Sequence, residues 1–334
     1  NTVLGTVVTD KHVYAAGGDI ATNAATDNVL PDQRKVENII SGIIGRSNSE
    51  NCSLNSSQME KLKILLVKNA DIFTDVTGIV GRTNVSKHNI DTGDSSPVVQ
   101  QCRRIPEAQK QIIDAEVDKM LELNVIKPSM SPYRANFVLV KKKDGTWRPC
   151  IDFRLLNNVT KKDVYPLPRI DETLDSLGSA KIFSTLDLAS GYWQVELSEG
   201  SQEKTAFSCR KGLFEFQVMP IGLCNAPSTF QRLMDLVLAG CLWQFCTVYL
   251  DDTIIFSTTF EEHLEHIQKV FDRLRMAGLT LKGTKCEFGR KEVPYLGHII
   301  SPECVRPNPK KIDAITAWPV PRDKKELASF MGLM

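Results

Sequence analysis

The chain of 334 residues is long enough for about two domains, and its 42% hydrophobic and 24% charged residues exclude collagen, coiled coil and wholesale disorder. A formal net charge of +1 excludes a uniformly basic surface, so any nucleic-acid site must be a local basic patch. The nine cysteines are scattered without a CxxC pair, which supports neither a zinc ribbon nor a disulfide framework. No apolar run is long enough to span a bilayer, so we expect no membrane partner.

The first third of the chain alternates weakly patterned segments with two helices. Residues 1–52 are rich in Thr, Asn, Ser, Asp and Gly, which predicts a linker or a loosely ordered segment. Apolar residues at helical spacing predict a short helix from Met59 to Leu66. A second helix is predicted from Pro106 to Leu121, with Pro128 as its stop signal.

A β-hairpin is predicted around Asp144-Gly145, a dipeptide typical of tight turns. The runs Phe137–Lys141 and Trp147–Asp152 form its two strands. Three lysines precede the turn and Arg148 follows it, so we expect the tip of this hairpin to be basic.

The rest of the chain alternates apolar strands with amphipathic helices. The expected elements are strands at Ile182–Leu188 and Trp193–Leu197, a helix at Phe230–Leu238, strands at Phe245–Leu250 and Thr253–Ser257 joined by Asp251-Asp252, a helix at Phe260–Met276 and a strand at Tyr295–Ile300. Gly278 marks the end of the longer helix.

Three carboxylates stand at the ends of apolar strands. Asp251 and Asp252 lie at the turn of one strand pair, and Asp187 ends a separate apolar run. An Asp-Asp turn alone is more often a surface turn, but a third acid at the end of a core strand favours a shared site, because such acids are costly unless a cation neutralises them. Carboxylate oxygens suit Mg²⁺, and two such ions can support an in-line phosphoryl transfer.

Five motifs in fixed order carry a resemblance to a known family. They are KKKDGTWR (141–148) with DFR (152–154), FSTLDLASGYWQ (183–194), MPIGLCNAPSTFQ (219–231), YLDD (249–252) and YLGH (295–298). Over residues 85–334 the chain resembles the reverse transcriptase of gypsy-type LTR retrotransposons, within Pol polyproteins. Ile221 and Cys224 depart from the family pattern, but no departure removes a metal ligand.

The resemblance implies an α+β right-hand polymerase, with an antiparallel palm sheet backed by helices. It implies a pre-polymerase segment at 53–100, fingers at 101–181, a palm at 182–305 with a fingers insertion near 203–220, and the start of a truncated thumb at 306–334. On this interpretation we expect the chain to be a fragment of a longer Pol polyprotein.

The same resemblance assigns three groups of site residues by motif position. They are the catalytic metal ligands Asp187, Asp251 and Asp252 with the backbone of Leu188, the nucleotide-binding Lys142, Arg148 and Tyr192, and the primer-binding Leu296 and Gly297. The implied activity is an RNA-directed DNA polymerase that extends a primer on RNA or DNA with dNTPs and two Mg²⁺ ions. Other Pol or Gag products are implied partners, and the implied location is the cytoplasm, in virus-like particles.

Alternatives remain open. The chain could be a catalytically silent Pol-derived fragment that only binds nucleic acid or partner subunits. Asp91-Thr92-Gly93 spells an aspartic protease motif, but it lacks apolar flanking strands, so a loop is favoured. For Tyr192 the alternative is simple packing on the palm. His263 and His266 lie one helical turn apart without another ligand, and we expect a solvated helix face there.

Overall fold

The computed structural model describes residues 33–45, 54–141, 145, 147–309 and 320–332. All of these belong to one compact unit, Pro31–Met334. Most of the expected linker, Lys142 and the Asp144 half of the hairpin turn lie outside the described residues. In the part that is described, no helix is long and apolar enough to cross a membrane.

A four-stranded antiparallel sheet lies at the centre, with the strand order β11-β5-β10-β9. The strands are β5 (Ile182–Asp187), β9 (Cys246–Tyr249), β10 (Asp252–Ser257) and β11 (Glu287–Arg290). Strands β5 and β10 pair along their whole length, from Ser257 opposite Ile182 to Asp252 opposite Asp187. Both are buried almost throughout, so each face of the sheet needs a covering layer.

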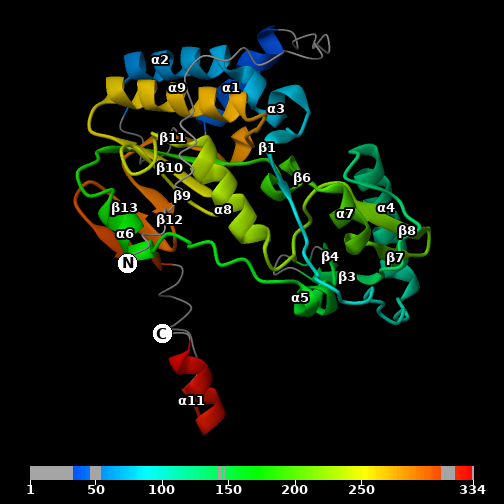
Figure 1. Cartoon of the computed structure of the whole chain (residues 1–334). Coiled ribbons are helices and arrows are strands. Elements are labelled where there is room, and N and C mark those ends of the chain that lie inside the picture. The colour runs from blue at the N-terminus through cyan, green and yellow to red at the C-terminus, as the bar shows by residue number, and fades with distance from the viewer. Residues whose placement is uncertain (1–32, 46–53, 142–144, 146, 310–319, 333–334) are drawn as a thin grey trace, which may run out of the picture. The chain divides into compact units, whose positions relative to one another are not determined.

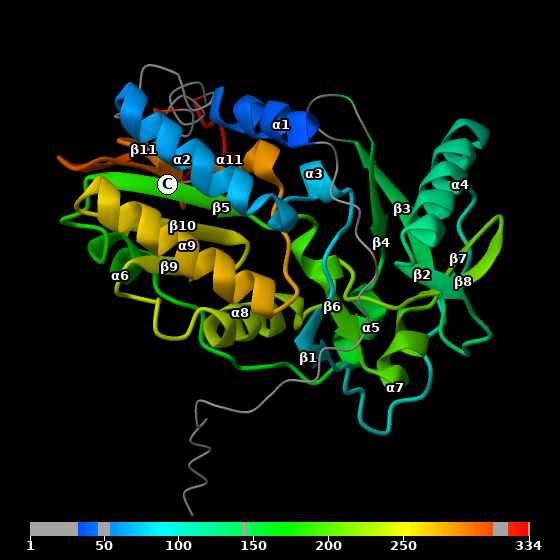
Figure 2. The same ribbon diagram turned by 90° about the horizontal axis from the view of Figure 1, so that it is seen from above.

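Helices cover one face of this sheet (Figures 1 and 2). They are α1 (Gln33–Gly45), α2 (Ser56–Lys68), α8 (Ala226–Val237) and α9 (Phe260–Met276). Helix α9 begins at a capping box in which Thr259 and Glu262 satisfy each other's backbone N–H groups. Its buried stripe, with Ile267 and Phe271, joins Ile255 of β10 in the main hydrophobic core.

The opposite face carries a smaller core. Ile254 and Phe256 alternate with Ile255 along β10, and they pack in a separate cluster with Tyr295. That cluster connects the central sheet to the three-stranded sheet β12-β13-β14, made of Val293–Tyr295, His298–Ile300 and Val305–Pro307. The helix α6 (Ile170–Asp175) lies beside it in Figure 1.

A five-stranded mixed sheet has the order β2-β8-β7-β3-β4. Its strands are Ile126–Pro128, Gly212–Phe216, Phe207–Cys209, Ala135–Lys141 and Trp147–Ile151, and it packs against α4 (Glu107–Glu122). Aromatic contacts hold it together, because the Phe207 ring lies 5.7 Å from that of Phe137 and 5.4 Å from that of Phe216.

The remaining elements are short and link these layers. They are α3 (Thr74–Thr77), α5 (Arg154–Val159), α7 (Glu199–Gln202), α11 (Lys324–Met331), the parallel pair β1 (Thr83–His88) and β6 (Val195–Leu197), and the 3-10 turns η2 (Ala70–Ile72), η3 (Gly191–Gln194), η4 (Glu203–Thr205) and η5 (Gly283–Lys285). This mixture of helices with antiparallel and mixed sheets confirms the expected α+β class.

Several expectations about single segments were wrong. Residues 33–45 form helix α1 and bury Ile40 and Ile43, so this part of 1–52 is no loose linker. Trp193 lies in the turn η3, and the following strand begins only at Val195. Pro128 ends strand β2 rather than the helix before it. That helix ends at Glu122 and is followed by its C-cap Leu123 and by Asn124, which takes a left-handed φ of 51°.

Three other corrections concern two turns and one histidine. The expected strand Tyr295–Ile300 is a hairpin whose loop is Leu296-Gly297. The β9–β10 loop is Leu250-Asp251, and Asp252 already belongs to the strand. His263 is 1% exposed rather than solvated, because its ring nitrogens are hydrogen-bonded to Ser184 (2.7 Å) and Ser257 (2.9 Å) of the central strands.

Candidate active site

The three acidic residues meet at one edge of the central sheet. Asp187 is the last residue of β5 and Asp252 the first of β10, and the two are directly paired in the antiparallel register. Such paired residues lie about 4.5–5.5 Å apart at their Cα atoms. Asp251 occupies the loop that precedes Asp252. Residues separated by more than sixty positions in sequence therefore share one short edge.

The electrostatics of this edge favour a cation. The surrounding protein raises the pKa of Asp251 by partial burial, and the charges of Asp252 and Asp187 raise it further, while Lys285 lowers it. Partial burial and the charge of Asp187 likewise raise the pKa of Asp252. Since both carboxylates reach solvent, these shifts describe negative charge that the protein itself leaves uncompensated.

Lys285 supplies the one cation that touches the cluster among the described residues. Its Nζ lies 3.3 Å from both carboxylate oxygens of Asp187. In the part of the chain that the structure describes, no group of three His, Cys, Asp or Glu side chains has the geometry of a metal site. Carboxylate oxygens are donors that a hard divalent cation prefers, so the donor set fits such a cation in its chemistry. One of the three carboxylates, Asp187, is engaged with Lys285.

The backbone of each acidic strand end is anchored. The N–H of Lys282 donates to the carbonyl of Asp187 at 2.8 Å, and the Tyr295 hydroxyl donates to the carbonyl of Asp252 at 3.3 Å. Leu188 is buried and pairs with Leu281 in an isolated bridge. Together these contacts hold the acidic edge against the segments that follow α9.

Tyr192 lies beside the acidic cluster. It stands in η3, where its ring packs edge-on against Phe230 of α8 with centroids 5.3 Å apart. Burial and the nearby charge of Asp251 raise the pKa of its hydroxyl to about 12. Tyr192 thus lies in a 3-10 turn just before the predicted strand Trp193–Leu197, within reach of the charge of Asp251.

The β12–β13 hairpin approaches the cluster from the other side. Its two-residue loop, Leu296-Gly297, has positive φ at both positions, 46° and 81°, which is the pattern of a type I′ turn. Leu296 packs on the smaller core, and Tyr295 reaches Asp252. A pocket of about 200 Å³ opens between this hairpin and the acids, lined among others by Asp187, Asp252, Lys285 and Tyr295.

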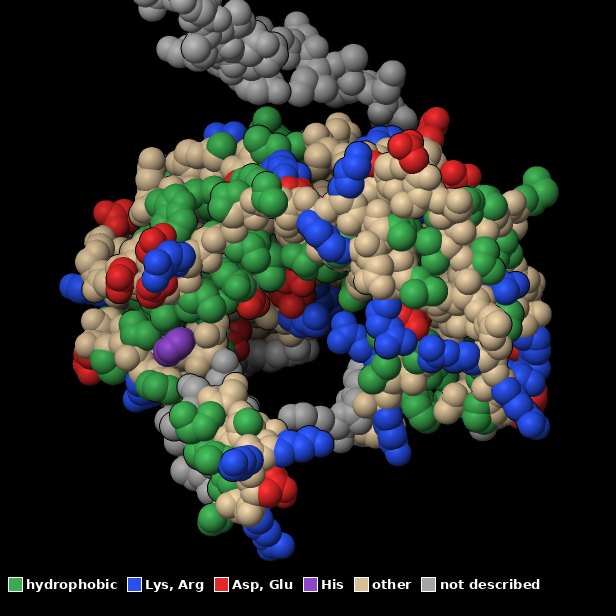
Figure 3. Space-filling model, turned by 60° about the horizontal axis from the view of Figure 1, so that its bottom comes forward, with side chains coloured by type: hydrophobic (Ala, Val, Ile, Leu, Met, Phe, Trp, Pro, Cys, Tyr) green, Lys and Arg blue, Asp and Glu red, His purple; other side chains and the backbone are tan. Residues whose placement is uncertain are grey.

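The β3–β4 hairpin stands apart from the acids. Arg148 is exposed on β4 opposite Val140, and its side chain makes no hydrogen bond or ion pair with another described residue. Lys142 lies outside the described residues. Figure 3 shows a face on which lysine and arginine side chains gather next to a group of acidic ones. Among the described residues, Arg148 is thus not brought into a hydrogen bond or ion pair with the carboxylates.

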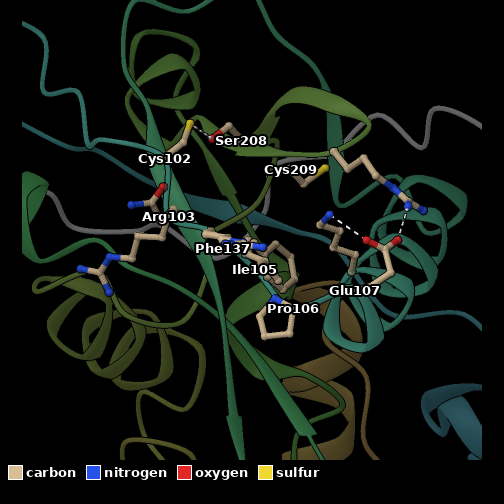
Figure 4. A pocket seen from close by; sticks show the side chains of 12 residues that line it. Cys102, Arg103, Ile105, Pro106, Glu107, Phe137, Ser208 and Cys209 are labelled. Atoms are coloured by element: carbon tan, nitrogen blue, oxygen red, sulfur yellow. Dashed lines mark hydrogen bonds and ion pairs between the residues drawn. The ribbon is translucent and has the colours of Figure 1, made fainter.

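A larger cavity of about 470 Å³ lies elsewhere, beside the five-stranded sheet (Figure 4). Glu107 in its wall is paired with Lys110 at 2.8 Å and with Arg210 at 3.1 Å, and Cys102 lies against Ser208. This cavity contains no cluster of acids, so the chemistry points to the smaller pocket rather than to the larger one.

Two functional candidates escaped the sequence analysis. Lys285 is one of them, because nothing in the sequence around it indicates a contact with Asp187, 98 positions away. Gln231 ends the MPIGLCNAPSTFQ motif, but its side chain is fully buried beneath the Leu250-Asp251 loop. A glutamine placed on the apolar face of a predicted helix is the only signal that could have revealed it.

Comparisons with known proteins agree with this geometry. Residues 140–300 match the family model "Reverse transcriptase (RNA-dependent DNA polymerase)". The Drosophila melanogaster Pol polyproteins from transposons 297 and gypsy are 42% and 36% identical, over 84% and 83% of this chain and 27% of each relative. The Schizosaccharomyces pombe Tf2-3 polyprotein is 33% identical over 68% of this chain and 17% of its own length. The chain thus spans about a quarter or less of these relatives.

Solved structures show the same fold. The foamy viral protease-reverse transcriptase bound to double-stranded DNA superposes with a TM-score of 0.79 and 28% identity, over 91% of this chain and 52% of that one. The same protein with an RNA/DNA hybrid gives a TM-score of 0.77 and 28% identity, over 91% and 40% of the two chains. Through residues 140–300 the chain belongs to the reverse transcriptase family, of the kind carried by the retrovirus-related Pol polyproteins of gypsy-type LTR retrotransposons.

Proposed function

We propose that this chain catalyses RNA-directed DNA synthesis, extending a primer on an RNA or DNA template. The observation that carries the proposal is the meeting of Asp187, Asp251 and Asp252 at one sheet edge, where burial and mutual repulsion raise the pKa values of the latter two. Perturbed pKa values of this kind concentrate at functional sites. The relatives named above support the same activity.

The three carboxylates would hold two Mg²⁺ ions, with the backbone of Leu188 nearby. When bound, the ions supply Lewis-acid activation of the primer hydroxyl and neutralise charge on the transferred phosphoryl group. The protein's own contribution is to hold Asp187 opposite Asp252 and to keep Lys285 at hand as a counter-charge when no metal is present. No side chain acts as a nucleophile in this chemistry, which consists of positioning and charge neutralisation.

The other motif residues would select and orient the substrates. Lys142 and Arg148 would contact the triphosphate of the incoming dNTP, and the ring of Tyr192 would fill the space of a ribose 2′-hydroxyl. Leu296 and Gly297 would hold the primer terminus. In this assignment the fingers comprise 101–181 with an insertion near 203–220, the palm 182–305, and residues 306–334 lead into a thumb.

A primed template is the principal partner in this proposal. The foamy viral structures of the same fold are described as complexes with double-stranded DNA and with an RNA/DNA hybrid, which supports this choice. We further propose other Pol or Gag products as partners, and a location in cytoplasmic virus-like particles.

A primer-extension assay tests the function directly. On a homopolymer RNA template with a DNA primer, we expect synthesis that requires Mg²⁺ and disappears in Asp251→Asn. Binding of the primed template without extension, under the same conditions and with every divalent cation tried, would instead support a catalytically silent fragment that only binds nucleic acid.

A further inference from the structure

We propose that Gln231 is a positioning residue that fixes the loop carrying Asp251, and that a side-chain relay through Asp235 and Tyr165 holds Gln231 in turn. The proposal rests on the function proposed above, because it assigns the relay the task of presenting Asp251 to metal. None of the three side chains touches the substrate or the metal in this account.

The loop needs such support because of its backbone. Only Leu250 and Asp251 join β9 to β10, and Leu250 has a φ of +54°. Glycine, asparagine or aspartate is the usual residue at a left-handed position of a two-residue hairpin loop, whereas the branched side chain of leucine disfavours it. A strained position persists only where its surroundings over-determine it, and such positions concentrate at functional sites.

Gln231 of α8 restrains the backbone of the β9–β10 loop through hydrogen bonds. Its side chain is 0% exposed, and its Oε1 accepts a hydrogen bond from the Leu250 N–H at 2.8 Å. Its Nε2 donates to the carbonyl of Val248 at 3.2 Å. The Gln231 amide therefore forms hydrogen bonds to the backbone on both sides of Tyr249, where β9 ends and the β9–β10 loop begins.

The hydrogen bond to Asp235 determines which side of the Gln231 amide carries the oxygen and which the nitrogen. Nε2 also donates to Asp235 Oδ1 at 2.9 Å, one helical turn further along α8. Both amide hydrogens thus meet acceptors, and Oε1 alone faces the Leu250 N–H. A flipped amide would place its oxygen against a carboxylate and a carbonyl, and would leave two N–H groups facing each other.

Asp235 is itself held from outside the helix. The Tyr165 hydroxyl donates to Asp235 Oδ2 at 2.6 Å. Arg232 lies over the Tyr165 ring at 4.6 Å and donates to both carboxylate oxygens of Asp163, at 2.8 and 2.9 Å. A surface segment that precedes α6 is thereby connected, through α8, to the backbone of the catalytic loop.

Gln231 is the one polar residue among the buried positions of α8. Its other buried positions, such as Phe230, Leu233 and Met234, are apolar and belong to the main core. An apolar side chain of the size of glutamine would fill the same space without the cost of burying an amide. Gln231 is therefore explained by its hydrogen bonds to the loop rather than by packing.

The decisive experiment compares metal binding and catalysis in Gln231→Met, which keeps the volume and removes the amide. We expect Mn²⁺ affinity, measured by electron paramagnetic resonance without nucleotide, to fall about fivefold, the equivalent of one lost hydrogen bond. Primer extension should show kcat lowered about tenfold, with the dNTP KM and the Kd for primed template changed less than about twofold. The amide of Leu250 should lose hydrogen-exchange protection.

Two further variants keep the test decisive if Gln231→Met folds poorly. Tyr165→Phe removes only the outer bond of the relay, and it should shift Mn²⁺ affinity about twofold in the same direction. Gln231→Glu places a second carboxylate beside Asp235 and should be worse than Gln231→Met. Adding Asp235→Asn returns an amide to the pair, and this double variant should recover part of the loss.

Asn69→Leu is the matched control. Asn69 is 2% exposed, and its amide donates to Leu65 and Gln268 and accepts from Arg275, all remote from the catalytic loop. It should lower the melting temperature as much as Gln231→Met does, with Mn²⁺ affinity unchanged. An equal loss of Mn²⁺ affinity in Asn69→Leu, or unchanged Mn²⁺ affinity and kcat in folded Gln231→Met, would overturn the proposal. An inactive wild-type chain would refute the polymerase function, while the Mn²⁺ and hydrogen-exchange comparison would still decide the role of Gln231.

Discussion

The β9–β10 loop and strand β4 both carry motif residues, but the surroundings of these residues differ. The first is gripped by buried side chains, since Gln231 binds Leu250 and Tyr295 binds Asp252. On β4, the Arg148 side chain is exposed and forms no hydrogen bond or ion pair with another described residue. The proposed function would account for this difference: carboxylates that are to share a metal need to be positioned before it arrives, whereas a cation that is to meet a triphosphate can be ordered by the substrate itself.

The largest effect on catalysis should come from substitution of Asp251 in the β9–β10 loop. Asp251→Asn is expected to lower the rate of nucleotide addition by about 10³-fold or more, because charge neutralisation by metal supplies several kcal/mol of the barrier reduction. The fold should survive and its melting temperature should hold or rise, since the raised pKa of Asp251 shows that its charge opposes folding. Single-turnover rates and thermal unfolding check both parts.

Glu261 offers a control for this substitution. It is a well-exposed carboxylate at a distance of 4.0 Å from Lys61, and Glu261→Gln should leave both rate and stability unchanged. If the rate of Asp251→Asn stayed within a factor of ten of the wild-type rate, Asp251 would not have the proposed metal-binding role.

Sugar selection should change next most strongly. Tyr192→Ala opens the space beside Asp251, and we expect the ratio of rNTP to dNTP incorporation to rise about tenfold or more as the steric clash disappears. Competition assays with matched dNTP and rNTP pairs measure this ratio. Tyr192→Phe keeps the ring and should keep the selectivity. An equal loss of activity toward both sugars would show that Tyr192 only packs against Phe230.

A smaller effect is expected on the hairpin. Arg148→Ala should raise the KM for dNTP about tenfold while the Kd for primed template changes little, because the lost contact is a charge-assisted bond to the triphosphate. Arg169, which is exposed and paired with Asp171, provides the control variant Arg169→Ala. Equal weakening of template binding, with an unchanged KM, would assign the hairpin to the template.

The smallest effect concerns the strands beneath the catalytic loop. Burial lowers the pKa of His263 to about 3, so its neutral ring joins Ser184 of β5 to Ser257 of β10. Its contribution is fully present above the unfolded pKa of about 6.5 and is lost as the pH falls toward the folded value, about 1 kcal/mol by pH 5.5. Urea unfolding of wild type and His263→Gln at pH 7.5 and 5.5 should show a flatter pH dependence in the variant. An unchanged pH slope would mean that His263 does not link the strands in this way.

Local patterns predicted the elements whose signals are complete within a short window. The helix at 260–276 was placed correctly because its cap, its apolar stripe and its terminal glycine all stand in sequence. The hairpin strands around Gly145 followed from alternation and turn chemistry. Helix α1 was missed because the sequence on either side of it is polar. Its burial depends on α2 and on the 3-10 turn η5, which lies more than two hundred residues later in the chain.

Some features of the candidate site could likewise be predicted from the sequence, and others only from the tertiary structure. The order of the motifs and the chemistry of three acids at strand ends were present in the sequence alone, and they indicated a metal-dependent polymerase before any contact was known. The pairing of Asp187 with Asp252, the ion pair of Asp187 with Lys285, and the grip of Gln231 on Leu250 came only from the tertiary structure. Side-chain type and spacing are local properties of a chain, whereas these contacts exist only because the packing of the whole core decides which distant strands and helices become neighbours.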